Sequence, residues 1–174
     1  MLQEFVDQVN KTAKKAIEGM HTALPGRITS FNPGTGMASV KPVAKFKKPN
    51  GETMDFPEVT GVPVVFPQSK NVTIAWPVKA GDGCLLVFSE TALDFWQYGK
   101  ETDTDLKFDL SNAIAIPGLS QKGNPVMEKA CAEDAAVIRS GGTTLTVKAS
   151  GVVIDGDVTI NGSLTTKGGT VNLN

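Results

Sequence analysis

The chain has 174 residues, which is enough for one ordinary domain with extensions, and its 17 basic and 18 acidic side chains give a formal net charge of -1. This balance gives no electrostatic reason to expect binding to nucleic acid or to an anionic membrane surface. With 18 glycines, 10 prolines and only two cysteines, Cys84 and Cys131, the composition favours an all-β body with many turns and excludes a disulfide framework.

An amphipathic helix is predicted over roughly residues 2–20, within a first segment of residues 1–24. Its apolar residues step alternately by four and three, as in a heptad seam, and Phe5 and Ile17 widen this seam. The seam consists of Leu2, Val6, Val9, Ala13, Ala16 and Met20. Two interpretations remain open: a short coiled coil, or a helix that lies on its own domain or on a neighbour.

The second segment, residues 25–119, has a β pattern and is predicted to form a small barrel. A hairpin is expected around the turn Pro33–Gly36, and Asn50–Gly51 is a strong signal for another turn. Further strands are predicted at NVTIAW (71–76), CLLVFS (84–89) and residues 113–117. About five strands in this length suit a closed barrel of the oligonucleotide/oligosaccharide-binding (OB) type, and a simple sandwich fits nearly as well.

After Ser89 the sequence changes character. Thr91 is expected to cap a short helical turn that carries Leu93, Phe95 and Trp96, and these aromatic side chains are expected to plug an open end of the barrel. Residues 120–140 are interpreted as a looser connector.

The last segment, residues 141–174, is predicted to be a slim β-structure. Its small apolar residues stand in pairs two apart, separated by glycine or polar residues, which is typical of short strands. Such thin apolar faces cannot fill a globular core, so we expect them to be buried against copies of themselves in an intertwined oligomer. The predicted trimer core consists of Leu145, Val147, Val152, Ile154, Val158, Ile160, Leu164, Val171 and Leu173.

Candidate catalytic and metal-ligating residues are few. His21 is the only histidine and has no serine or cysteine in a nucleophile context beside it, which argues against an enzyme of the catalytic-triad kind. Zinc sites and nucleotide-binding glycine motifs have no support. The acidic side chains could bind calcium or form a carboxylate pair for glycoside cleavage, but solvated loop carboxylates are the commoner explanation. These acidic residues are Glu101, Asp103, Asp105 and Asp109 for calcium, and Glu90 with Asp94 for the pair.

A basic run, Lys45-Phe46-Lys47-Lys48, precedes the Asn50–Gly51 turn. A barrel of this type could use it to hold a single nucleic-acid strand, although a solvated hairpin tip is the simpler interpretation at this overall charge.

A longer run carries a resemblance to a known family. The stretch VPVVFP, the turn WPVKAGDG, the strand end LLVFSE, the aromatic residue after ALD and the closing DLSNAIAIPGL occur in the same order as in the central spike of contractile-tailed phages. The similarity runs from about Gly26 to Leu119, and GDVTINGSLTTKG is similar to the β-helical shaft of such spikes.

The resemblance implies a non-enzymatic homotrimer in the tail baseplate, with OB-like barrels under the tail hub and C-terminal segments wound into a β-helix that punctures the host envelope. The chain would be assembled in the host cytoplasm, since it has no secretory signal and no apolar stretch long enough to span a bilayer. Some family members hold a tip iron with a His-x-His motif. No histidine follows Gly141 here, so we expect no tip iron and no other cofactor. Either a separate cap protein sharpens the tip, or apolar packing alone forms it.

Two other functions remain as alternatives. One is an OB-type module that binds nucleic acid or glycan, and the other is a β-helical enzyme that degrades the envelope.

Overall fold

The computed structural model describes residues 2–48, 50–100 and 106–169. They form two compact units, Met1–Gln121 and Lys122–Asn174, which are described separately below. None of the helices in the described ranges is long and apolar enough to cross a membrane.

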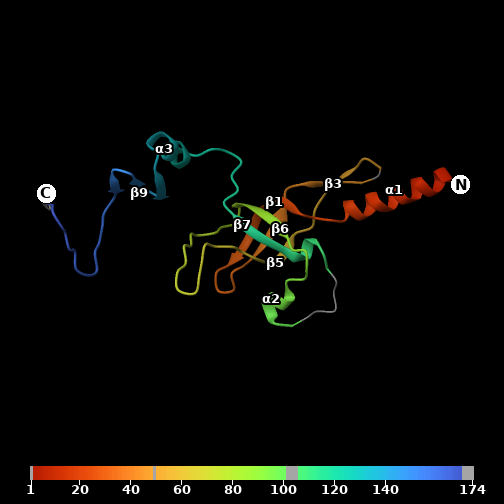
Figure 1. Cartoon of the computed structure of the whole chain (residues 1–174), viewed down its shortest axis with the longest axis horizontal. Coiled ribbons are helices and arrows are strands. Elements are labelled where there is room, and N and C mark those ends of the chain that lie inside the picture. The colour runs from red at the N-terminus through yellow and green to blue at the C-terminus, as the bar shows by residue number, and fades with distance from the viewer. Residues whose placement is uncertain (1, 49, 101–105, 170–174) are drawn as a thin grey trace. The chain divides into compact units, whose positions relative to one another are not determined.

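The first unit contains most of the regular structure (Figure 1). In chain order its elements are α1 (Leu2–Glu18), β1 (Ala23–Asn32), β2 (Met37–Pro42), β3 (Lys45–Lys47), β4 (Thr53–Asp55), β5 (Val59–Pro63), β6 (Gly83–Phe88), α2 (Asp94–Tyr98), the 3-10 helix η1 (Leu110–Asn112) and β7 (Ala113–Pro117). The predicted N-terminal helix is thus confirmed and ends at Glu18, just before Gly19.

Five of these strands form one curled antiparallel sheet in the order β5-β2-β1-β6-β7. Just beyond β5, Val64 forms a parallel bridge with Ala115 of β7, and the amide of Val65 donates to the carbonyl of Ala115 at 2.9 Å. The two edges of the sheet therefore meet at this bridge. This mostly β architecture agrees with the predicted small barrel.

The core of the unit lies on the concave side of this sheet. Residues of β2 and β6 alternate between partly and fully buried, as expected for strands with one face on a core. The buried apolar side chains are Ile28, Ala38, Val40, Val59, Val62, Cys84, Leu86, Phe88, Ala113 and Ala115. Burial raises the pKa of the Cys84 thiol to about 11, so this cysteine is a core residue as its sequence context predicted.

Both predicted hairpins form, and hydrogen bonds within their turns fix their positions. The amide of Gly36 donates to the carbonyl of Asn32 at 2.9 Å, and Gly36 has a φ of +69°, which glycine adopts without strain. The second hairpin pairs β3 with β4 through a turn in which the amide of Gly51 donates to the carbonyl of Lys48 at 2.9 Å.

The strand predicted at residues 71–76 is wrong. This segment is part of a loop. The amide of Ser69 donates to the carbonyl of Val72, and the amide of Ile74 donates to the carbonyl of Pro67. The physical reason is that β5 and β7 meet at the Val64 bridge, so the sheet has no free edge there for another strand.

The predicted cap and plug after Ser89 are also wrong. α2 begins at Asp94, and no side chain caps its start at Leu93. Phe95 and Trp96 are exposed in this chain, so they do not fill an end of the barrel.

The closing segment before β7 is held by polar side chains. Asp109 accepts hydrogen bonds from the hydroxyl and the amide of Ser111 at 2.6 and 2.8 Å, and these bonds hold the pKa of Asp109 below its usual range. The buried Asn112 donates to the carbonyl of Leu106 at 2.9 Å. Asp109 therefore caps the 3-10 helix η1.

The second unit begins inside the stretch expected to be a loose connector. It contains α3 (Pro125–Glu133), β8 (Ala136–Ser140), β9 (Thr143–Lys148) and β10 (Gly151–Asp155). The side chain of Asn124 accepts from the amides of Val126 and Met127 at 2.9 and 3.1 Å, and Pro125 occupies the first helical position. Residues 125–140 are therefore ordered by a helix cap and by strand pairing.

We predict that Gly83→Ala destabilises the first unit. An added Cβ would lie 2.0 Å from the carbonyl oxygen of Leu119, which belongs to the backbone and has no side-chain freedom to move away. The expected loss is about 1–3 kcal/mol of unfolding free energy, measured by denaturant titration. Gly123→Ala is the control, because an added Cβ there meets no atom within 4 Å. Equal stability of the two variants would contradict this assignment.

Candidate functional site

The second unit is built on a three-stranded antiparallel sheet in the order β10-β9-β8. The register aligns Val137, Thr146 and Val153 across the three strands, and it aligns Ile138, Leu145 and Ile154 one step along. Because side chains alternate along each strand, these two rows project from opposite faces of the sheet.

One face of this sheet lies against α3. Lys148 of β9 pairs with Glu133 at 3.1 Å, and Lys129 of α3 pairs with Asp155 of β10 at 3.6 Å. Thr146, which shares this face with Lys148 and Asp155, is 2% exposed. The helix therefore covers Thr146 in the middle of this face, and ion pairs border the covered region, whereas Val153 at the edge of the same row is 46% exposed.

The opposite face carries only apolar side chains over two adjacent rows. Val147 aligns with Ala136 and Val152 in one row, and Leu145 aligns with Ile138 and Ile154 in the other. Most of these side chains are accessible, with Val152 60% and Ile138 65% exposed. We call this surface the open face; its residues are Ala136, Ile138, Leu145, Val147, Val152 and Ile154. A sheet face of this composition is typical of an interaction surface.

Four residues of the predicted trimer core lie together on the open face: Leu145, Val147, Val152 and Ile154. Val158, Ile160 and Leu164 are exposed and lie in a stretch, residues 156–169, that has neither strand nor helix. Val171 and Leu173 lie outside the described residues. Within one chain, residues 136–155 are thus an antiparallel meander.

Sequence reasoning missed Ala136 and Ile138, which complete the open face. The two residues stand two positions apart, as the later apolar pairs do, and the turn at Gly141–Gly142 follows them, so the same strand pattern is present in the sequence. It was hidden because both residues lie within an alanine-rich patch, Cys131–Ile138, that was interpreted as part of the connector.

The predicted seam of α1 is exposed along its whole length. Leu2, Val6, Val9, Ala13, Ala16 and Met20 are all accessible, as are Phe5 and Ile17 beside them. The first unit therefore carries a second apolar surface that its own described residues leave uncovered.

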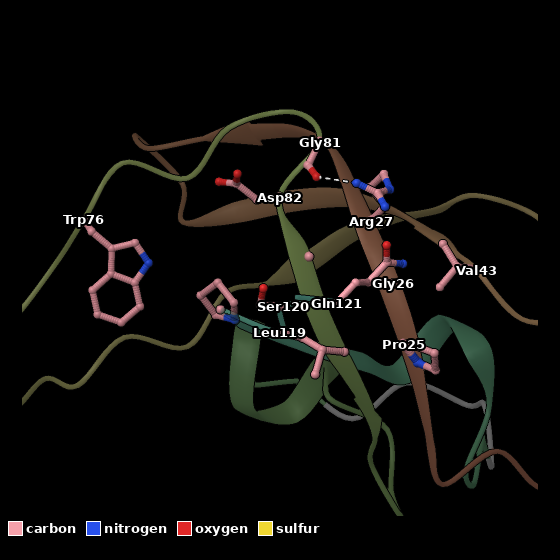
Figure 2. A pocket seen from close by; sticks show the side chains of 13 residues that line it. Pro25, Gly26, Arg27, Val43, Trp76, Gly81, Asp82, Leu119, Ser120 and Gln121 are labelled. Carbon is pink, nitrogen blue, oxygen red and sulfur yellow. Dashed lines mark hydrogen bonds between the residues drawn. The ribbon is translucent and has the colours of Figure 1, made fainter. Parts of the chain in front are cut away.

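A hollow of about 400 Å³ lies at the ends of β1 and β6 (Figure 2). Its two charged side chains fix the adjoining turn: the Arg27 guanidinium donates to the carbonyl of Gly81 at 2.8 Å, and the Asp82 carboxylate accepts from the amide of Lys79 at 2.8 Å. The backbone of β1 also bonds to this turn: the amide of Ile28 donates to the carbonyl of Asp82 at 2.9 Å, and the carbonyl of Ile28 accepts from the amide of Gly81 at 2.8 Å. These contacts indicate a structural role for the hollow.

A second hollow, of about 390 Å³, is mainly apolar and lies between residues 63–68 and α2. Leu93, Trp96 and Ile114 contribute to its lining. Phe66 packs edge-on against Trp76, with ring centroids 5.3 Å apart. No convergent set of polar groups accompanies the described aromatic residues here, as a small-molecule site would need.

The other predicted site residues are dispersed. Lys45 pairs with Asp55 at 3.5 Å and Lys48 pairs with Glu52 at 3.3 Å, so acidic partners on the same hairpin offset part of the charge of the basic run. The ring of His21 lies 5.7 Å from those of Phe56 and Phe88. Glu101, Asp103 and Asp105 lie outside the described residues. Within the described ranges, no three His, Cys, Asp or Glu side chains gather as a metal site.

Comparison with known families gives a match over residues 24–118 to the family described as "Phage protein Gp138 N-terminal domain". The matched range covers more than half of the chain and contains the whole curled sheet apart from the first residue of β1. α1, α3 and the strands of the open face lie outside it. A comparison with the curated proteins finds no match.

We predict that Thr146→Val stabilises the second unit. The Thr146 hydroxyl is buried under α3 without a hydrogen-bond partner among the described residues, so replacing it by a methyl group removes a desolvation penalty of roughly 1–2 kcal/mol. The measurement is hydrogen exchange of the β9 amides in the full chain, which should slow. Thr144→Val, on the same strand and face but partly exposed, should change little. Faster exchange in Thr146→Val would show that the hydroxyl has a partner.

Proposed function

The chain belongs to the family of phage proteins with the Gp138 N-terminal domain, and from this membership we propose that it is the central spike of a contractile tail baseplate. As a phage structural protein of mostly β architecture, it would act as a homotrimer. Its body would attach to the tail hub, and its C-terminal part would be the piercing shaft.

The open face is the observation that carries the proposal. A sheet in water is stable when each apolar face is packed against another layer, and here α3 supplies only one layer. Burial of apolar surface contributes about 25 cal/mol per Å², so copies that cover each other's open faces gain stability from aliphatic contacts. Around a threefold axis the same surface of each chain would face the axis, with α3 on the outside.

The stretch that follows the sheet supports the same arrangement. Val158 and Ile160 stand two apart after Gly156, and all three are exposed. Extended chain with this spacing forms a strand when a neighbouring strand offers its backbone groups. In the proposed trimer, residues 156–169 of three chains wind around one another, and the pairing between chains provides the β-helix that one chain lacks.

The shaft would work mechanically. A β-structure paired between chains has few free strand edges, so a load along its axis is distributed over many hydrogen bonds. Separation of the chains requires many of these bonds to break together, which favours kinetic stability. The sheath supplies the work when it contracts, and the narrow tip concentrates the force on the envelope.

We predict that Ile154→Ser abolishes or strongly weakens self-association, because it places a hydroxyl among the apolar side chains of the open face. Light scattering should give three times the chain mass of 18.3 kDa for the unmodified protein and a value close to the single chain for the variant. Val153→Ser is the matched control: both side chains are 46% exposed, but Val153 lies on the opposite face. A monomeric unmodified protein, or equal masses for both variants, would argue against the proposal.

We also predict that the protein is located at the end of the phage tail farthest from the head. Antibody raised against the full chain and viewed by electron microscopy on intact particles should label this tail tip. Antibody pre-absorbed with the purified chain is the control and should label nothing. Label confined to heads or tail fibres would refute a baseplate spike.

A further inference from the structure

α1 is a helix of 17 residues whose apolar side is not covered by the described part of its own chain. Leu2 is 82% and Ile17 70% exposed, and the seam residues between them are exposed as well. Single helices of this length are marginally stable in water, because most helical stability in proteins comes from packing of the apolar face. The helix therefore needs a surface to cover it.

The order of residues around α1 limits what that surface can be. With Val6 and Ala13 at heptad position a, Leu2, Val9 and Ala16 fall at position d. The flanking e and g positions, which face a partner helix across the seam, all hold uncharged residues: Gln3, Phe5, Asn10, Thr12 and Ile17. The charged residues Glu4, Asp7, Lys11, Lys14 and Lys15 fall at the outer positions b, c and f.

This distribution suits a parallel bundle of identical helices. In a parallel bundle each g position meets an e position of the neighbour, so charged flanks on identical chains would often set like charges against one another. Here Phe5 would meet Asn10, and Thr12 would meet Ile17, without a charge at either contact. Phe5 and Ile17 also widen the apolar side beyond a strict two-position seam, and a bundle of three buries a wider side than a pair does.

We propose that three copies of α1 pack in parallel as a bundle at the N-terminal end of the trimer. This inference rests on the proposed threefold assembly, which brings the three N-terminal helices to a high effective concentration. Leu2, Val6 and Val9 form the bulky half of the bundle core, and the smaller Ala13 and Ala16 let the helices approach closely in the other half. The apolar seam of α1 is thus covered by α1 helices of other copies of this chain, not by a different protein.

Disulfide trapping in the full chain tests the bundle. Val9→Cys, at a core position, and Lys11→Cys, at an outer position two residues away, are made in a Cys131→Ser background because Cys131 is exposed and would also react. After mild oxidation we expect Val9→Cys to give linked pairs at least tenfold more abundantly than Lys11→Cys, with one thiol of each trimer left unpaired. Cys84 is buried and can remain in both variants.

The outcomes separate this inference from the proposed function. Trimers by light scattering in which Val9→Cys links no better than Lys11→Cys would overturn the bundle and leave the spike intact, and α1 would then be assigned to a partner protein. A monomeric chain would overturn both. As a second measurement, Val9→Asp should lower the helical circular dichroism of the full chain, whereas Lys11→Asp should not; equal signals would also overturn the bundle.

Discussion

A three-stranded sheet has two faces, and one helix of nine residues can cover only one of them. This constraint governs the second unit, Lys122–Asn174. Lys129, Glu133, Lys148 and Asp155 hold α3 on the face of Thr146, and the row of Leu145 is left accessible on the other side. The apolar surface that remains is part of the fold, and an exposed apolar surface of this kind is typical of an interaction site.

The body solves the same problem within one chain. Its sheet curls until β5 and β7 meet at Val64 and Ala115, so its apolar side encloses a core of its own. Gly26 and Gly83 permit this tight curvature, because a Cβ at Gly26 would lie 2.6 Å from Val40 and one at Gly83 would meet the Leu119 carbonyl. The two units thus contrast: one has an internal core, and the other exposes the surface on which a core would form.

Local signals in the sequence were sufficient for the elements that depend on local chemistry. The turn of Asn32–Gly36, the seam of α1 and the alternation through Cys84–Phe88 are each encoded within a few residues, and all were predicted. The strand predicted at residues 71–76 does not form, because a segment with high strand propensity still needs a free sheet edge to pair with. The sequence does not show that β5 and β7 meet at the Val64 bridge and leave no such edge. α3 begins with a local signal, Asn124 followed by Pro125, which the interpretation of residues 120–140 as a looser connector does not include. For the candidate site, the spacing of Leu145, Val147, Val152 and Ile154 predicted an apolar face, but only the register places Ile138 in line with Leu145 and Ile154.

The open face also has a consequence for the order of events during biosynthesis. The body buries Leu86 and Val40 by an intramolecular reaction, whose rate does not depend on how much protein is present. Covering Ile138 and Val152 with another chain is a bimolecular reaction, whose rate rises with concentration. In the proposed assembly, newly made chains would therefore pass through an interval in which the body has folded and the open face is not yet covered, and this interval would shorten as the concentration of chains rises.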